Sequence, residues 1–230
     1  MATNDRFTSP LFVTMRFVAQ RMMLKPLVWT LTRVQIHNRK QLRDLPPAFI
    51  VVANHSSHLD APLTMGSIPW SKARYLAAGA AADYFFDVAW RKWLTALFFN
   101  AVPVDRGGRR KSAGISKSLL EREVPLLIFP EGGRSKDGVL GSFKPGAAAL
   151  AISSNVPCLP VAIVGANKAM PRGQSWPNNG RFPVGIVFGA PMHHHEGETS
   201  EEFSLRLARE VVRLHSSITI PGVPPIEVKE

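Results

Sequence analysis

Apolar residues along the chain recur at two spacings, and the spacings predict alternating helices and strands. Leu11, Met15, Val18 and Met22 follow the helical period and predict a helix over residues 9–32. Short apolar runs predict strands at 48–53, 74–78, 101–104, 125–129, 158–164 and 184–188. The segments between them predict helices at 57–67, 80–98, 112–122, 147–153 and 200–216, the last capped by Ser200. This alternation predicts an α/β fold with a central, largely parallel β-sheet flanked by helices.

The helix expected at 9–32 is amphipathic and basic. Arg16, Arg21 and Lys25 fall opposite its apolar stripe, which large side chains widen (Phe12, Met23, Trp29). Such a helix is typical of segments that lie in a membrane interface. The alternative is a helix that packs on its own domain. Pro26 is expected to kink or split it.

Charge adds to the membrane interpretation. The chain has 28 basic and 17 acidic residues, a net charge of +11. Such an excess indicates an anionic partner, either nucleic acid or a membrane surface. We divide the chain into an N-terminal amphipathic membrane-association segment (1–33), a catalytic domain (34–218) and a proline-rich, loosely held tail (219–230). Cys158 is the single cysteine and lies in an expected core strand, where packing is its expected role.

The candidate chemistry begins where the 48–53 strand ends, in Asn54-His55-Ser56-Ser57-His58-Leu59-Asp60. If Ser57 caps the following helix, Asp60 falls at its third position and His55 stays in the turn before it. Asp60 could then accept the Nδ1 proton of His55 and leave Nε2 as a general base. The simpler alternative is a helix cap beside an ordinary turn histidine.

Cations follow the next strand ends. Arg106 closes Val102-Pro103-Val104-Asp105-Arg106, at a strand end where anions bind in α/β folds. The turn Phe129-Pro130-Glu131-Gly132-Gly133-Arg134-Ser135 follows a buried strand; its glycines could admit an anion, and Arg134 could clamp a phosphate. Glu131 could bond a substrate hydroxyl or hold an arginine, and Lys144 adds a cation.

These elements, in this order, resemble the glycerolipid acyltransferases, the 1-acyl-sn-glycerol-3-phosphate acyltransferases and their relatives. The family's His-x4-Asp motif is matched by His55 to Asp60 and its Val-Asp-Arg motif by Val104 to Arg106. Its Phe-Pro-Glu-Gly motif is matched by 129–135 and its Val-Pro-x-x-Pro-Val motif by 156–161. The resemblance covers about residues 34–215.

The resemblance implies transfer of an acyl group from acyl-CoA or acyl carrier protein to a lysophosphatidate-type hydroxyl. His55 and Asp60 would be catalytic, and the acceptor would be bound by the remaining motif residues (Arg106, Glu131, Gly132, Gly133, Arg134, Ser135, Lys144). No cofactor, metal or nucleic acid is expected. The protein would lie peripherally on an anionic membrane, at the cytoplasmic face of the cell membrane. Two departures, Asn100 in place of a frequent glycine and Gly133 in place of threonine, are expected near the acceptor.

Two other classes stay open. A metal-dependent hydrolase could use His55, His58 and Asp60, with the histidines at 193–195. A non-catalytic protein that binds nucleic acid or lipid surfaces would fit the charge, but it gives no use to a His–Asp pair. Another lysophospholipid or glycolipid hydroxyl is the alternative acceptor.

Overall fold

A seven-stranded sheet forms the centre of the molecule. We describe residues 6–81, 89–104, 110–135 and 138–227 of a computed structural model. The strand order is β1-β7-β6-β2-β5-β3-β4. The strands are β1 (Arg33–His37), β2 (Ile50–Ala53), β3 (Ala77–Ala81), β4 (Val102–Val104), β5 (Leu126–Ile128), β6 (Cys158–Val164) and β7 (Pro183–Phe188). Only β6 and β7 pair antiparallel among these, so the predicted largely parallel α/β sheet is confirmed.

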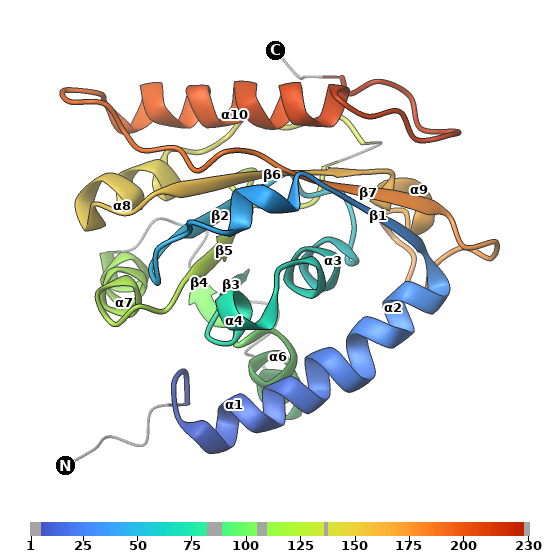
Figure 1. The fold of residues 1–230 in the computed structure, drawn as a ribbon, viewed down its shortest axis with the longest axis horizontal. Coiled ribbons are helices and arrows are strands. Elements are labelled where there is room, and N and C mark those ends of the chain that lie inside the picture. Colours follow the sequence, from blue (N-terminus) through green and yellow to red (C-terminus); the bar gives the residue numbers. More distant parts are fainter. Residues whose placement is uncertain (1–5, 82–88, 105–109, 136–137, 228–230) are drawn as a thin grey trace.

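Helices cover both faces of this sheet (Figure 1). One face carries α7 (Arg110–Glu121), α8 (Gly146–Ser154) and α10 (Ser200–Ser216). The other face carries α3 (Asp60–Ser67). Three short helices lie in the connections between larger elements: η2 (Arg39–Leu42), α4 (Trp70–Ala73) and α9 (Ala166–Ala169). The predicted inward stripe of α10 is confirmed, because Phe203, Leu207, Val211 and Leu214 are buried. Its cap is Thr199 rather than Ser200, in a capping box with Glu202.

Three boundaries differ from the prediction. Residues 33–37 form β1, an edge strand parallel to β7 that the sequence pattern did not predict. The strand expected at 74–78 begins at Ala77 and runs on to Ala81. The helix expected from residue 80 is α6 (Ala89–Phe99). The segment Ala77–Ala81 is rich in alanine, which favours helix, but pairing with β4 and β5 overrides that local preference.

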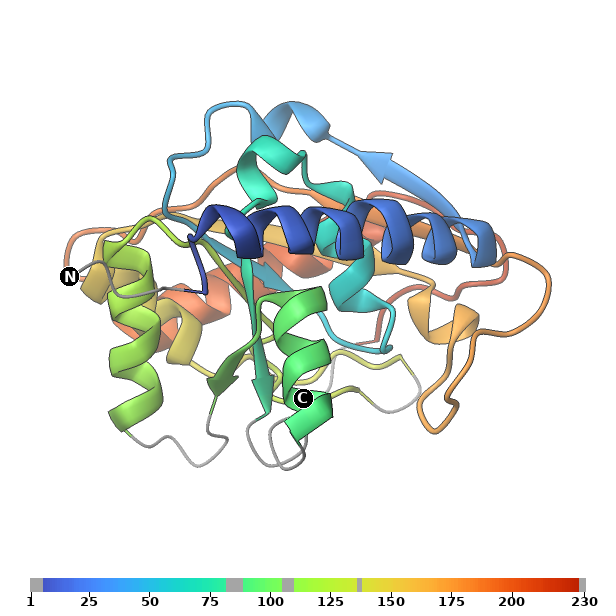
Figure 2. The ribbon, with the colours of Figure 1, turned by 90° about the horizontal axis from the view of Figure 1, so that it is seen from below.

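The N-terminal helix is a continuous rod (Figure 2). It consists of α1 (Pro10–Phe17), a π-helical segment η1 (Val18–Leu24) and α2 (Lys25–Leu31). Pro26 does not split it. The N–H of Lys25 donates to Gln20 O, five residues back, so the hydrogen-bond register widens directly before the proline. The predicted split is therefore wrong, because the π-helical turn accommodates a residue that has no N–H, while a kink at Pro26 stays a prediction.

The basic side of this rod faces the protein. Arg16 is only 2% exposed and donates to Arg6 O, Phe7 O and Asn100 Oδ1. Arg21 donates to the carbonyls of Met65, Gly66 and Ile68, at the end of α3. The last carbonyls of a helix have no partner within it, so Arg21 caps α3. Burial lowers the pKa of Arg21 below its ordinary value.

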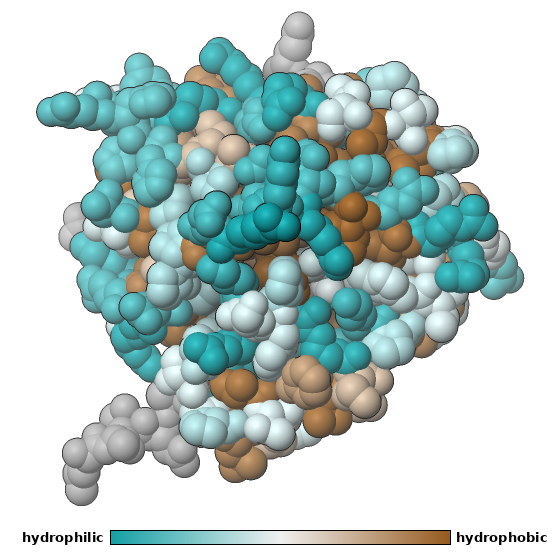
Figure 3. All heavy atoms as spheres, in the orientation of Figure 1, coloured by the Kyte–Doolittle hydropathy of each residue, from teal (hydrophilic) through white to brown (hydrophobic). Residues whose placement is uncertain are grey.

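The apolar side of the rod faces outward. Leu11, Val18 and Met22 are 67%, 47% and 64% exposed. Hydrophobic surface gathers along the lower edge of Figure 3, where Figure 1 places this helix. Within the described residues, no helix has both the length and the apolar character needed to cross a bilayer. The helix therefore packs on its own domain while it presents an apolar stripe to the surroundings, and membrane contact stays a prediction.

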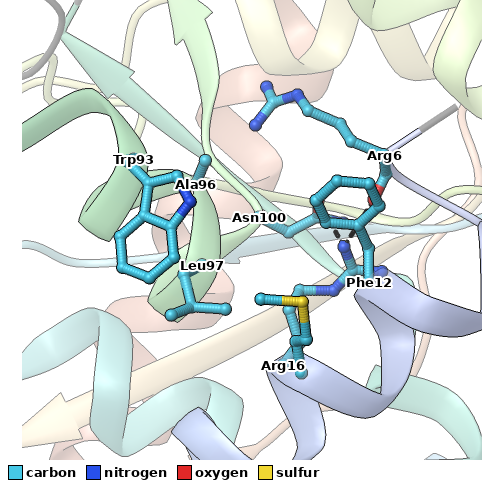
Figure 4. Close-up of a pocket in the computed structure, with 8 residues that line it drawn as sticks. Arg6, Phe12, Arg16, Trp93, Ala96, Leu97 and Asn100 are labelled. Carbon is cyan, nitrogen blue, oxygen red and sulfur yellow. Dashed lines mark hydrogen bonds between the residues drawn. The ribbon is translucent and has the colours of Figure 1, made fainter. Parts of the chain in front are cut away.

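A small cavity of about 40 Å³ lies between α1 and α6 (Figure 4). Phe12 and Arg16 line it from one side, and Trp93 and Leu97 from the other. Asn100, at its base, precedes β4, so the cavity lies at the amino ends of the parallel strands. His55 follows the carboxyl end of β2, so the cavity and His55 lie at opposite ends of the parallel strands.

The C-terminal segment touches the domain at a few points. Ile220 is 2% exposed, and Leu140 N donates to Glu227 O at 2.8 Å. A Cβ placed on Gly165 would meet Val223 Cγ2 at 3.1 Å, which shows how closely this segment approaches the sheet. Pro221, Gly222, Pro224, Pro225 and Glu227 are exposed, and residues 223–227 form no helix or strand, so a loosely held tail stays a prediction.

Candidate active site

His55 and Asp60 meet directly after the carboxyl end of β2. His55 Nδ1 lies 2.8 Å from Asp60 Oδ2, and the Asp60 side chain is fully buried. The same oxygen accepts the main-chain N–H groups of Ser56 and Ser57, at 2.6 and 2.7 Å. Asp60 is the first residue of α3, so the helix starts later than the predicted cap at Ser57 implies. Part of the expected capping pattern is present, because Ser57 N–H donates to Asp60 Oδ2 and Leu59 N donates to Ser57 Oγ at 3.2 Å. The carboxylate reaches back and orders the turn that carries His55.

The 129–135 loop holds His55 from both sides. The N–H of His55 donates to Glu131 Oε1 at 2.6 Å, and its carbonyl accepts from Ser135 N at 2.7 Å. The ring of Phe129 stacks on the imidazole, with centroids 4.2 Å apart and planes inclined by 18°. The histidine side chain is 21% exposed. Among the described residues, no side chain or main-chain group bonds to its Nε2, which is accessible for chemistry.

Glu131 joins two loops. Its Oε2 accepts the N–H of Gly141 at 2.9 Å, while Oε1 serves His55. Burial raises the pKa of Glu131, and the two main-chain N–H bonds oppose that rise. Both carboxylate oxygens therefore contact main chain, in a position that orients the histidine turn. Direct contact of Glu131 or Ser135 with a substrate stays a prediction.

Cations surround this turn. Arg134 Nη1 is buried and has no hydrogen-bond partner among the described residues. The Lys144 side chain passes over Gly132, because a Cβ at that glycine would lie 2.9 Å from Lys144 Nζ. Gly132 has a φ of +72°, a conformation that favours glycine. A Cβ on Gly133 would meet no atom within 4 Å. Arg106 lies outside the described residues.

His58 lies on the same side of the turn. The His58 residue reaches solvent, but neighbouring atoms partly desolvate its ring, and this desolvation lowers its pKa together with the positive charge of Arg134 and with His55. His58 is therefore a neighbour of the Arg134 guanidinium, which the sequence spacing alone does not predict.

Sequence reasoning missed several supporting residues. Asn54 bonds both main-chain groups of Ile163, at 2.8 and 2.9 Å, and so fixes the end of β2 against β6. Phe129 stacks on the imidazole of His55, a contact that its position before Pro-Glu-Gly does not predict. Arg172 donates to Arg134 O at 3.0 Å, and its sequence context carries no signal of this contact. Cys158 is buried, which raises the pKa of its thiol to about 12 and keeps it protonated.

Asn100 is not near this site, contrary to expectation. It precedes β4, at the opposite edge of the sheet, with a φ of 49°. Asparagine tolerates this left-handed conformation better than most residues, which explains how it can stand where glycine is frequent. Its side chain donates to Tyr75 O and accepts from Arg16, so it anchors the N-terminal helix.

The sequence and the fold of this chain both match known proteins. The sequence profile of the Acyltransferase family matches residues 33–164, more than half of the chain. The chain belongs to the acyltransferase family. This chain is similar to a 1-acyl-sn-glycerophosphate acyltransferase from Thermotoga maritima, whose crystal structure superposes with a TM-score of 0.71 at 25% identity. That match covers 89% of this chain and 78% of the other.

Curated relatives point the same way. The chain is 29% identical over 170 residues to the chloroplast 1-acyl-sn-glycerol-3-phosphate acyltransferase of Arabidopsis thaliana, and 30% identical over 149 residues to that of Brassica napus. These matches cover 72% and 64% of this chain. They span 45% and 41% of the relatives, so the chain corresponds to less than half of their length.

A metal centre was the rival interpretation of the histidines. Across residues 6–81, 89–104, 110–135 and 138–227, no group of three or more His, Cys, Asp or Glu side chains is placed to hold a metal ion. His193 to His195 lie in the loop before α10 rather than beside His55.

Proposed function

We propose that this acyltransferase moves a fatty acyl group from an acyl thioester to the free hydroxyl of a lysophosphatidate-type lipid. The contact between His55 Nδ1 and Asp60 Oδ2 carries the proposal. A carboxylate can only accept a hydrogen bond, so this contact favours the Nδ1–H tautomer. Nε2 then has a lone pair available to take a proton from a substrate hydroxyl.

The reaction needs one base and no covalent enzyme intermediate. His55 Nε2 takes the acceptor hydroxyl proton as the oxygen attacks the thioester carbonyl. The new C–O bond forms, the C–S bond breaks, and the imidazolium returns the proton to the departing thiolate. Asp60 keeps the ring oriented and stabilises its positive charge, as in serine hydrolase triads.

The acceptor phosphate would lie among the cations of the second loop. Arg134 Nη1 is buried without a partner among the described residues, and an unpaired buried guanidinium nitrogen costs free energy unless an anion satisfies it. Lys144 lies over the Gly132 turn beside it. Arg106 would complete the set, as the family motif implies. Positioning by these cations would supply rate enhancement beyond that of the base.

Lysophosphatidate is the first choice of acceptor because the curated relatives are named 1-acyl-sn-glycerol-3-phosphate acyltransferases. The acyl donor would be either acyl-CoA or acyl carrier protein. The outward apolar stripe of the N-terminal helix supports peripheral attachment to an anionic membrane, which we place at the cytoplasmic face of the cell membrane.

A panel of acceptors tests this function. Purified protein would be incubated with oleoyl-CoA and lysophosphatidate, other lysophospholipids or a glycolipid, and products would be identified by mass spectrometry. We expect phosphatidate as the main product. Acylation of another acceptor alone would contradict the assigned substrate, and no acyl transfer to any member would contradict the function.

Chelation separates this proposal from metal-dependent hydrolysis. Because no step above uses a metal ion, EDTA should leave acyl transfer unchanged. Activity that disappears with EDTA and returns with a divalent cation would favour the rival.

A further inference from the structure

The loop between α9 and β7, residues 171–182, exposes two aromatic side chains. Trp176 is 61% exposed and Phe182 is 37% exposed. The loop has twelve residues and no helix or strand of its own. Loops of this length without regular structure are uncommon in compact domains and are usually functional. Tryptophan is normally well buried, so its exposure at this place needs an explanation.

The loop is fastened at three places. Asn178 bonds the carbonyls of Ala169 and Lys168, at 2.7 and 2.9 Å. Arg181 donates to Trp29 O, at the end of the N-terminal helix, and Arg172 donates to Arg134 O in the candidate site. The loop therefore bridges the outward apolar helix and the cations expected to hold the acceptor phosphate. In Figure 2 the loop, in orange, lies at the right edge of the molecule, beyond the carboxyl end of the N-terminal helix.

The charges around the loop indicate which kind of partner it contacts. Lys168, Arg172 and Arg181 are all exposed, and the sequence has no acidic residue from 138 to 195. Tryptophan and phenylalanine among cations suit the interface of an anionic bilayer, where the rings enter the headgroup layer and the cations meet lipid phosphates. Leu27, 45% exposed on α2, continues this apolar surface toward the helix.

We propose that the 171–182 loop is a second membrane contact, which places Trp176 and Phe182 in an anionic bilayer beside Arg134. Two separated contacts, the helix and this loop, hold the protein in one orientation on the surface. Because Arg172 links the loop to Arg134, the candidate site then lies next to the lipid headgroups. A lysophosphatidate-type acceptor could then reach the site without leaving the membrane, a consequence that rests on the function proposed above.

Vesicle binding tests the loop without reference to catalysis. Full-length protein would be sedimented with vesicles of phosphatidylcholine and phosphatidylglycerol, and with vesicles of phosphatidylcholine alone. We expect Trp176→Ser and Phe182→Ser each to weaken binding to the anionic vesicles by about tenfold, the effect of exposing one large apolar side chain. Leu205→Ser is the matched control, because Leu205 is 57% exposed on α10, across the sheet, and should bind as the wild type does.

A second measurement locates the ring itself. Brominated lipids should quench the fluorescence of the wild type more than that of Trp176→Phe, because Trp176 lies in the bilayer. Unchanged thermal unfolding midpoints would show that the variants remain folded. Equal quenching in both proteins, or unchanged vesicle binding by Trp176→Ser, would overturn the proposal.

Other roles of the loop have distinct outcomes. If Trp176→Ser converts a dimer to a monomer in light scattering, the aromatic surface covers a second copy and the proposal is wrong. Loss of activity toward a short-chain, water-soluble lysophosphatidate would place Trp176 in the catalytic site and would also overturn it. Should the wild type acylate no acceptor, the proposed function fails while the vesicle experiments still decide the role of the loop.

Discussion

At the residue scale, a substitution of Glu131 tests whether the 129–135 loop orients His55 or binds the acceptor. Both of its oxygens accept main-chain N–H groups, so Glu131→Gln would place an amide N–H against one of these donors. We expect kcat to fall by about tenfold or more with the acceptor KM little changed, because a displaced His55 affects the transition state more than binding. Steady-state kinetics would measure both.

The matched control for Glu131 is Glu121→Gln, an exposed change on α7 that should leave both constants unaltered. A raised acceptor KM with an unchanged kcat would contradict the orienting role and favour direct contact with the substrate.

Neighbouring glycines of the same turn should respond differently. Gly132 has a φ of +72° and lies under Lys144, so Gly132→Ala should lower the free energy of unfolding by about 1–3 kcal/mol. A side chain at Gly133 enters open space, so Gly133→Thr should change it by less than about 0.5 kcal/mol. Urea unfolding of both variants measures this contrast. Equal destabilisation would show that the turn differs from the one described.

At the element scale, α10 contains a buried histidine that should make stability depend on pH. Burial lowers the pKa of His215 from 6.5 to about 4. The unfolded chain therefore binds a proton that the folded chain does not, and stability is lost as pH falls from 6.5 toward 4. The full loss is about 3 kcal/mol.

Urea unfolding as a function of pH would measure this effect. His215→Leu should flatten the acid side of the stability profile, since leucine does not titrate. His193→Leu, at an exposed loop position, should keep the wild-type slope. A slope unchanged by His215→Leu would contradict the assignment.

The same scale shows which elements sequence patterns can predict. The β6 strand and α10 were placed correctly because a long apolar run and a long helical stripe leave no alternative register. The β1 strand was missed because Arg33-Val34-Gln35-Ile36-His37 has only two apolar positions, so its alternation is too short to separate it from the end of the preceding helix, and its pairing with β7 establishes it. The start of β3 was misplaced because alanine and glycine carry little information about strand pairing.

The candidate site was only partly predictable for a similar reason. The spacing of His55 and Asp60 was sufficient to expect their contact, although the helix starts at Asp60 rather than after Ser57. The clamp from Glu131, Ser135 and Phe129 depends on β5 lying next to β2, which no local pattern encodes. Long-range pairing thus decides which motif residues support the histidine.

At the scale of the whole molecule, the N-terminal helix should hold the protein on membranes through its outward stripe. Leu11→Ser combined with Met22→Ser removes two side chains that are 67% and 64% exposed. Sedimentation with anionic vesicles should fall strongly, since each lost apolar contact weakens binding about tenfold or more. The unfolding midpoint should stay within a few degrees of the wild type, because neither side chain is buried.

Deleting the helix is a poorer experiment than these substitutions. Arg21 caps α3, whose first residue is Asp60, so removal of the helix would disturb the candidate site as well as membrane contact. Unchanged sedimentation of the double variant would contradict the membrane role of the stripe.

The most direct test of the central claim is the kcat/KM of His55→Ala for lysophosphatidate with oleoyl-CoA, measured by thiol release and phosphatidate formation. The variant should remain folded with the wild-type unfolding midpoint, because Asp60 keeps its main-chain donors Ser56 and Ser57. We predict a loss of about 10²–10⁴-fold, the usual contribution of a general base. A folded His55→Ala protein with activity within about twofold of the wild type would contradict the role of His55 as that base.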